Sequence, residues 1–147
     1  MNNVDGIKAT GRLEITLTDG NGAVKQHLEV PNLVVTVGKS YLASRAVGTA
    51  VATMSHMAVG TQSNSLTAAD TALQSELIRV SLASSIATTN VIAYVANFPA
   101  GVATGNLVEA GIFNAASAGT MMCRTTFPSI NKEASDTLAI NWNLTIN

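Results

Sequence analysis

The chain has 147 residues, of which 47% are apolar and only 12% are charged, and its formal net charge is −1. A charged fraction of roughly 25% is typical of soluble domains. The length fits one domain with a sizeable core, the apolar content excludes a disordered chain, and the lack of clustered lysines and arginines argues against nucleic acid as a partner.

The N-terminal residues carry no targeting signal. Residues 1–5 are mostly polar and lack the basic and apolar regions of a signal peptide. No window approaches the roughly 18 apolar residues that cross a membrane. We therefore expect a protein that is made in a cytoplasm, has no membrane partner, and consists of an N-terminal arm over residues 1–8 and one domain over residues 9–147.

Alternation predicts the first strand. Residues 13–17 alternate apolar and polar side chains, which is typical of a strand with one dry face. The segment that follows, Asp19 to Gly22, contains the Asp-Gly and Asn-Gly pairs that favour a tight hairpin turn. The return strand is predicted over residues 24–30, before Pro31.

A short helix is predicted next. Leu33 to Val37 form a β-branched run that predicts a strand, and Gly38 is expected to break it. Residues 39–47 then place apolar side chains at helical spacing, with Gly48 as a stop. Another strand is predicted over residues 54–60.

Loops and strands alternate in the middle of the chain. Residues 61–70 are predicted to form a polar loop. Asp70 is predicted to cap a helical turn through Leu77, because its carboxylate can accept the free N–H groups there. Residues 78–82 predict a strand by alternation, and the small polar residues 83–90 predict a loop.

Strands are also predicted over residues 91–98 and in a second hairpin. There, residues 107–113 and 121–127 flank a Gly-containing loop over residues 114–120. A polar link over residues 128–136 is expected to lead to the last strand.

The last segment, residues 137–147, has the clearest pattern of the chain. Its apolar positions alternate strictly with Thr, Ala and Asn; they are Leu138, Ile140, Trp142, Leu144 and Ile146. Its wet face holds no charge, although exposed strands of solitary proteins usually carry Lys or Glu that prevent sheets from associating. The neutral face therefore predicts contact with other protein.

These elements predict an all-β fold of about eight strands with one or two short helices. Turn signals separate the strands at short intervals, as in β-sandwiches, whereas alternating βαβ units are absent from the pattern. We expect a single-domain, jelly-roll-like β-sandwich.

The chemistry-bearing residues predict no active site. His27 is expected to be exposed, His56 lies between apolar neighbours, and Cys123 is expected to be buried. None of them has the spacing of a metal site, and the nucleotide-binding and hydrolase fingerprints are missing. We therefore predict no catalytic residue, no metal, no cofactor and no small-molecule substrate.

The remaining charges and the aromatic residues have structural interpretations. Glu76 and Arg79 are predicted to form a local ion pair on a helical turn, and Glu109 and Arg124 to meet across the second hairpin. The aromatic residues expected in the core are Phe98, Phe113, Phe127 and Trp142.

Several short motifs over residues 54–147 together resemble small virion structural proteins of tailed bacteriophages. The motifs, in order, are Asp70 to Leu73, Glu76 to Arg79, Phe98 to Gly101, Glu109 to Asn114, Gly119 to Arg124, and Asn131-Lys132 before the alternating last strand. The piece Glu109 to Phe113 also resembles part of the N-terminal domain of phage tail-collar fibre proteins. The resemblance implies a virion structural component and not an enzyme.

Two roles follow from this resemblance. We expect a capsid cement (decoration) protein that binds the major capsid protein and further copies of itself as a dimer or trimer, because no long fibrous shaft follows the last strand. The alternative is a tail, neck or fibre-attachment protein. A carbohydrate-binding module would need more exposed aromatic residues. The regions expected to contact partners are the arm 1–8 and the loops 61–70, 83–90 and 114–120.

Overall fold

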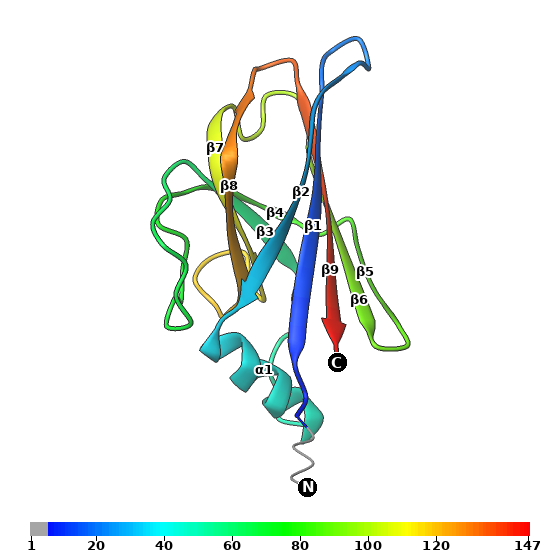
Figure 1. Ribbon diagram of the computed structural model, residues 1–147, viewed down its shortest axis with the longest axis vertical. Coiled ribbons are helices and arrows are strands. Elements are labelled where there is room, and N and C mark those ends of the chain that lie inside the picture. Colours follow the sequence, from blue (N-terminus) through cyan, green and yellow to red (C-terminus); the bar gives the residue numbers. More distant parts are fainter. Residues whose placement is uncertain (1–5) are drawn as a thin grey trace, which may run out of the picture.

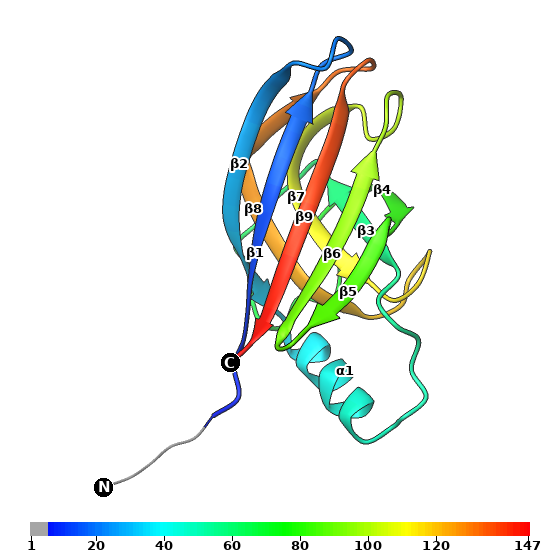
Figure 2. The ribbon, with the colours of Figure 1, turned by 90° about the vertical axis from the view of Figure 1, so that its right-hand side faces the viewer.

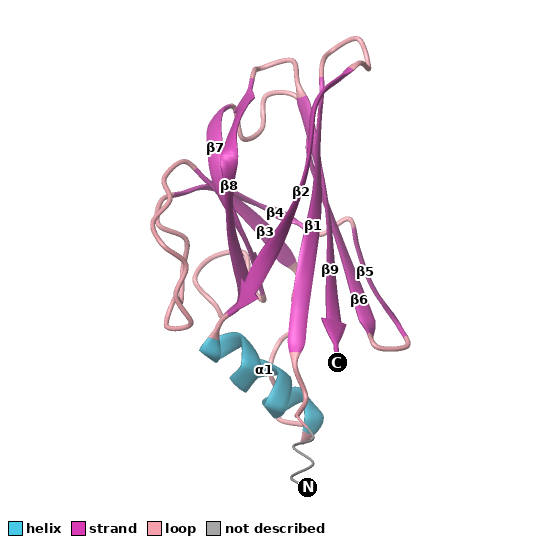
Figure 3. Ribbon diagram, viewed as in Figure 1, coloured by secondary structure: helices cyan, strands magenta, loops and turns pink. Residues whose placement is uncertain are grey.

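The fold is all-β, as the alternation predicted. The computed structural model describes residues 6–147, which form nine strands and one helix (Figures 1 and 3). The elements are β1 (Ala9–Thr18), β2 (Val24–Val34), α1 (Thr36–Ala46), β3 (His56–Gly60), β4 (Glu76–Ser81), β5 (Ser84–Thr88), β6 (Val91–Phe98), β7 (Gly105–Phe113), β8 (Met121–Lys132) and β9 (Thr137–Ile146).

All neighbouring strands are antiparallel and follow the order β4-β3-β7-β8-β2-β1-β9-β6-β5. Strand β2 forms the corner of this curled sheet. Its residues 24–32 pair with β1, whereas Leu33 and Val34 pair with Arg124 and Cys123 of β8. We call β2, β1, β9, β6 and β5 layer A, and β8, β7, β3 and β4 layer B. Figure 1 shows the two layers edge-on. The jelly-roll connectivity stays a prediction.

The main core lies between the two layers. The predicted core aromatic residues Phe98, Phe127 and Trp142 are all buried there, and Trp142 is fully enclosed. The inward side chains of β9 alternate with exposed or half-buried ones along the strand, as predicted. Full burial of a side chain such as Leu, Ile or Phe contributes about 1.5–3 kcal/mol to stability.

The prediction around Gly38 is wrong. Strand β2 runs through Pro31 and ends at Val34, and the helix begins at Thr36, so Gly38 lies in its first turn. A Cβ at Gly38 would lie 2.1 Å from the carbonyl oxygen of Met122. The glycine therefore allows α1 to approach the backbone of β8 closely, and it does not break a strand.

Three further boundaries differ from the predictions. Asp70 caps no helix, because the chain stays irregular until β4 begins at Glu76. The segment 83–90 contains strand β5, which was predicted as a loop. Strand β8 continues to Lys132 through residues predicted as a link.

The two layers differ in what covers their outer faces. On layer B, the outward side chains pack under the segment of residues 61–75 in a second apolar cluster; its members are Val35, Ala58, Leu73, Phe113 and Met121. This segment is the green loop on the outer side of layer B in Figure 1. Figure 2 views layer A from outside, and there no ribbon segment crosses in front of β1, β9 and β6. Layer A therefore has the uncovered sheet face.

Candidate functional site

The candidate site is the outer face of β5, β6 and β9 in layer A. The register places Ile86 beside Ala93, and Ala93 beside Asn143, so that these outward side chains form continuous rows. We call this surface the neutral face; its residues are Ser84, Ile86, Thr88, Val91, Ala93, Val95, Asn97, Thr137, Ala139, Asn141, Asn143 and Thr145.

The neutral face is uncharged over its whole width. Neither residues 80–108 nor residues 137–147 contain Asp, Glu, Lys or Arg. The outward side chains of β6 are mostly apolar (Val91, Ala93 and Val95) and are half-buried, whereas Ile86 on β5 is 59% exposed. An apolar strip with an amide and hydroxyl rim is typical of a protein-binding surface.

Strand β5 also leaves one edge of the sheet unprotected. It lies at the end of the strand order and pairs only with β6 among the described strands. Edge strands of solitary proteins usually carry charge or proline, which block pairing with another chain. Residues 83–90 contain neither, so the edge and the neutral face form one surface suited to contact with protein.

The other half of layer A is charged but internally paired. On the outward face of β1 and β2, Arg12 pairs with Glu29, and His27 Nε2 lies 2.9 Å from the Glu14 carboxylate. His27 is exposed, as predicted. Exposed pairs of this kind contribute about 0–1 kcal/mol. They mark the boundary of the neutral face.

A buried ionic network holds the segment 61–75 against layer B. Arg124 Nη2 donates to Glu109 at 2.7 Å, and Arg124 Nη1 donates to Asp70 at 2.8 Å. The carboxylate of Glu109 also accepts the backbone N–H groups of Gln74 and Ser75 at 2.9 and 2.7 Å. The predicted pairing of Glu109 with Arg124 is therefore confirmed, and both side chains are buried.

The pKa values within this network follow from its hydrogen bonds. Burial alone raises the pKa of Asp70, but hydrogen bonds from Thr67 and Arg124 outweigh it and hold the pKa below its usual value. Burial alone lowers the pKa of Arg124, and the hydrogen bonds to Glu109 and Asp70 outweigh it and raise the pKa. Asp70 thus acts as a charged clamp on the loop and not as the predicted helix cap.

Arg79 fastens the loop 114–120. The predicted ion pair between Glu76 and Arg79 is present at 2.8 Å, but on strand β4 and not on a helical turn. The guanidinium lies 3.6 Å over the ring of Phe113 and donates to the carbonyl oxygens of Ala115 and Ala118. Of the three loops expected to contact partners, 61–70 and 114–120 are therefore tied to layer B, and only 83–90 lies on the neutral face.

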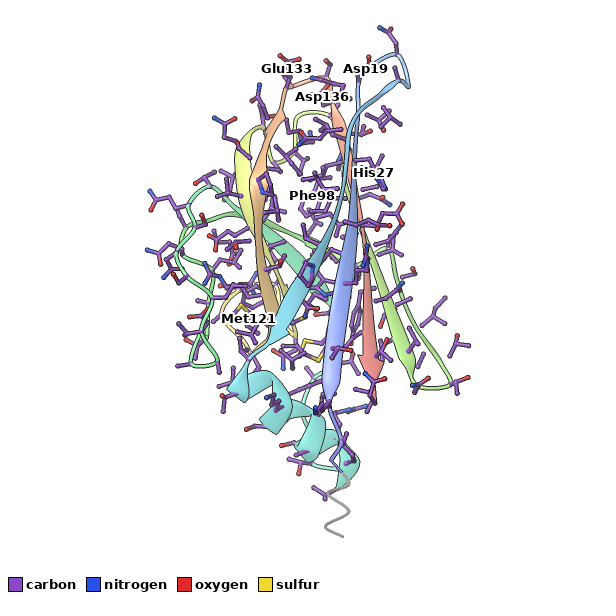
Figure 4. The ribbon with its side chains drawn as sticks, in the orientation of Figure 1. Asp19, His27, Phe98, Met121, Glu133 and Asp136 are labelled. Carbon is purple, nitrogen blue, oxygen red and sulfur yellow. The ribbon has the colours of Figure 1, made fainter. Side chains whose placement is uncertain are left out.

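A second ionic cluster closes the end of the molecule far from α1. Figure 4 shows Asp19, Glu133 and Asp136 gathered there. Lys25 donates to Asp136 at 2.8 Å and to Glu133 at 3.1 Å, and the hydrogen bond from Lys25 lowers the pKa of Asp136. The cluster joins the first hairpin to the turn between β8 and β9.

The remaining candidate residues lie apart. Cys123 is fully buried, as predicted, and burial raises the pKa of its thiol. His56 is the first residue of β3 in layer B, and its Nδ1 lies 2.8 Å from the hydroxyl of the preceding Ser55. Within residues 6–147, no three His, Cys, Asp or Glu side chains are grouped as metal ligands. The predicted arm falls on residues 1–5, outside the described residues, and on residues 6–8.

Comparison of the chain with models of known protein families, with curated proteins and with solved structures finds no match. Within the described part of the chain, no helix is long and apolar enough to span a membrane.

Proposed function

We propose that this protein is a structural component of a bacteriophage virion, a capsid cement protein that binds the major capsid protein shell through its neutral face. The observation that carries the proposal is the uncharged, uncovered outer face of β5, β6 and β9 with its unprotected edge strand. The sequence motifs that resemble small virion proteins supply the identity of the partner. The role is non-enzymatic, and the protein occupies the outer surface of the shell.

The chemistry of the neutral face suits such a partner. Amide and hydroxyl side chains can pair with backbone groups of a neighbouring subunit without the desolvation penalty of a charge. The apolar strip on β6 supplies the part of the contact that excludes water. Repetition of such a contact over a shell gives avidity even when each contact is modest.

Cement proteins stabilise a shell because they bind its assembled form. Any protein that binds only the assembled state shifts the equilibrium toward that state by mass action. The low charge of the face predicts that binding depends little on salt, because screening acts on charged contacts.

The copy number per particle tests the proposal. Quantitative mass spectrometry of purified virions would compare this protein with the major capsid protein. We expect a ratio near one or a simple fraction of one. A handful of copies per particle would overturn the cement role and favour a tail, neck or fibre-attachment protein.

A further inference from the structure

A groove lies between α1 and the strand ends at the base of layer A. Its volume is about 800 Å³. Leu42, Ala43 and Ala46 of α1 line one wall, and Ile7 and Ile146 line the other. The side chain of Leu42 is half-buried against the main core, so the helical wall is held in place from below.

Two lysines add positive charge to this apolar groove. Lys8 and Lys39 both contribute to its lining. No carboxylate among residues 6–147 lies within ion-pair distance of either ammonium group. An occupant that complements the groove would therefore combine apolar side chains with one carboxylate.

The chain itself leads past this groove. Lys8 directly precedes β1 and is fixed there by two backbone hydrogen bonds of 2.7 Å with Asn147. Before it, the side chain of Ile7 is 86% exposed, and Gly6 has no heavy atom within 4 Å of the position of a Cβ. In Figure 2, residues 6–8 leave past the end of β9, on the side away from α1.

The N-terminal residues have the composition that the groove requires. Residues 1–5 combine the apolar side chains of Met1 and Val4 with one carboxylate, that of Asp5. Ile7 already forms a wall of the groove in its own chain, so Val4 and Asp5 would have to reverse direction within two residues to enter it. The same residues of a second copy can enter without this reversal.

We propose that the groove binds residues 1–5 of a second copy of this chain. Val4 of that copy packs against the wall formed by Leu42, and the carboxylate of Asp5 pairs with Lys39 and Lys8, while Ile7 of each copy stays in the wall of its own groove. Five extended residues span about 17–18 Å, enough to follow the roughly 16 Å length of α1. Mutual exchange of the two arms forms a two-fold dimer with identical contacts on both copies.

This inference goes beyond the proposed function: it develops the self-association that the sequence resemblance implies, and it uses a surface separate from the neutral face. A failure of arm exchange would leave the copy number on particles unchanged. A failure of the capsid role would leave the exchanged dimer intact. The two proposals can therefore be judged separately.

Cysteine crosslinking of the whole chain tests the exchange. The variant Val4→Cys with Ala43→Cys would be oxidised mildly and run on a non-reducing gel; Cys123 stays out of the reaction because it is fully buried. We expect disulfide-linked dimers that disappear on reduction. The matched control is Val4→Cys with Ser40→Cys, because Ser40 is exposed on α1 but does not line the groove; it should give about tenfold fewer dimers.

Charge exchange gives an independent test by light scattering. Asp5→Lys should weaken the dimer about tenfold, and adding Lys39→Asp should restore it. Equal crosslinking in the control pair, or a disulfide within one chain, would overturn the proposal. A monomer that retains a small molecule in native mass spectrometry would overturn it as well, because the groove would then have another occupant.

Discussion

At the scale of single residues, Arg124 has the largest expected effect on stability. It is buried together with Glu109, and it also binds Asp70 and Asn64. Arg124→Leu would leave Glu109 buried without its countercharge, which typically costs about 3–5 kcal/mol. We expect a loss of that size in the free energy of unfolding, measured by urea denaturation.

The control for this variant is Arg12→Leu, which removes an exposed ion pair with Glu29. Its effect should stay within about 1 kcal/mol. Equal losses for the two variants would show that the network around Arg124 does not hold the segment 61–75.

At Asn32, in contrast, a substitution should increase the free energy of unfolding. Its side-chain amide is buried against Gly11 and finds no hydrogen-bond partner among residues 6–147. A buried polar group without a partner costs about 1–3 kcal/mol, so Asn32→Leu should raise the free energy of unfolding by a similar amount. Thermal and urea unfolding would measure the change. The exposed Asn131→Leu on β8 serves as the control and should change little.

The lowered pKa of Asp70 predicts a loss of stability in acid. The folded state holds this carboxyl below its usual pKa, so the folded state binds fewer protons than the unfolded chain near that value. The resulting stabilisation is present above the unfolded pKa and is lost as the pH falls through the folded pKa. Asp136 acts in the same direction.

Unfolding curves at neutral pH and at about pH 3 test this sign. Asp70→Asn should be less stable than the natural chain at neutral pH, and it should lose less stability on acidification. If Asp70→Asn lost as much stability on acidification as the natural chain, Asp70 would not contribute to the loss of stability in acid.

At the scale of elements, Gly38 was predicted to break a strand, but it lies in the first turn of α1. A glycine in an exposed helix usually gains about 1 kcal/mol when it is replaced by alanine. Here the new Cβ would meet the backbone of Met122 at 2.1 Å, so Gly38→Ala should instead cost about 1–3 kcal/mol. The midpoint of thermal unfolding would fall. Gly20→Ala meets only ordinary contacts and should be tolerated; stabilisation by Gly38→Ala would contradict the close approach of α1 to β8.

Strands with strict alternation could be predicted from the sequence, because burial on one face determines every second residue. This explains why β1 and β9 were predicted correctly. Strand β5 was missed because it is a sheet edge with little burial, so its residues carry no periodic apolar signal. The helical turn predicted after Asp70 was wrong for another reason. The Asp70 carboxylate accepts hydrogen bonds from the backbone N–H of Thr67 and from Arg124, and the Arg124 contact spans 54 positions of the sequence.

At the scale of the whole molecule, only part of the neutral face could be predicted. The uncharged side of β9 is visible in the sequence, and the contact with other protein that it predicts stays a prediction. The extension of the neutral face over β6 and β5 depends on the sheet register, which aligns Val95 with Asn141 of β9 and Ile86 with Ala93 of β6. The contrast with the covered face of layer B depends on the buried network around Arg124, where only the pairing with Glu109 was predictable.

The neutral face also makes the central claim testable with one exposed side chain. Ile86→Lys places a charge at the unprotected edge, where burial in an interface would cost several kcal/mol. Val24→Lys is the matched control, because Val24 is a similarly exposed β-branched residue (62% against 59%) on the charged side of layer A. Both variants should fold as stably as the natural chain.

The most direct measurement is the amount of each variant retained on purified particles, relative to the major capsid protein. We predict that Ile86→Lys is lost from the particles while Val24→Lys is retained at the level of the natural chain. Equal retention of the two variants would contradict binding through the neutral face.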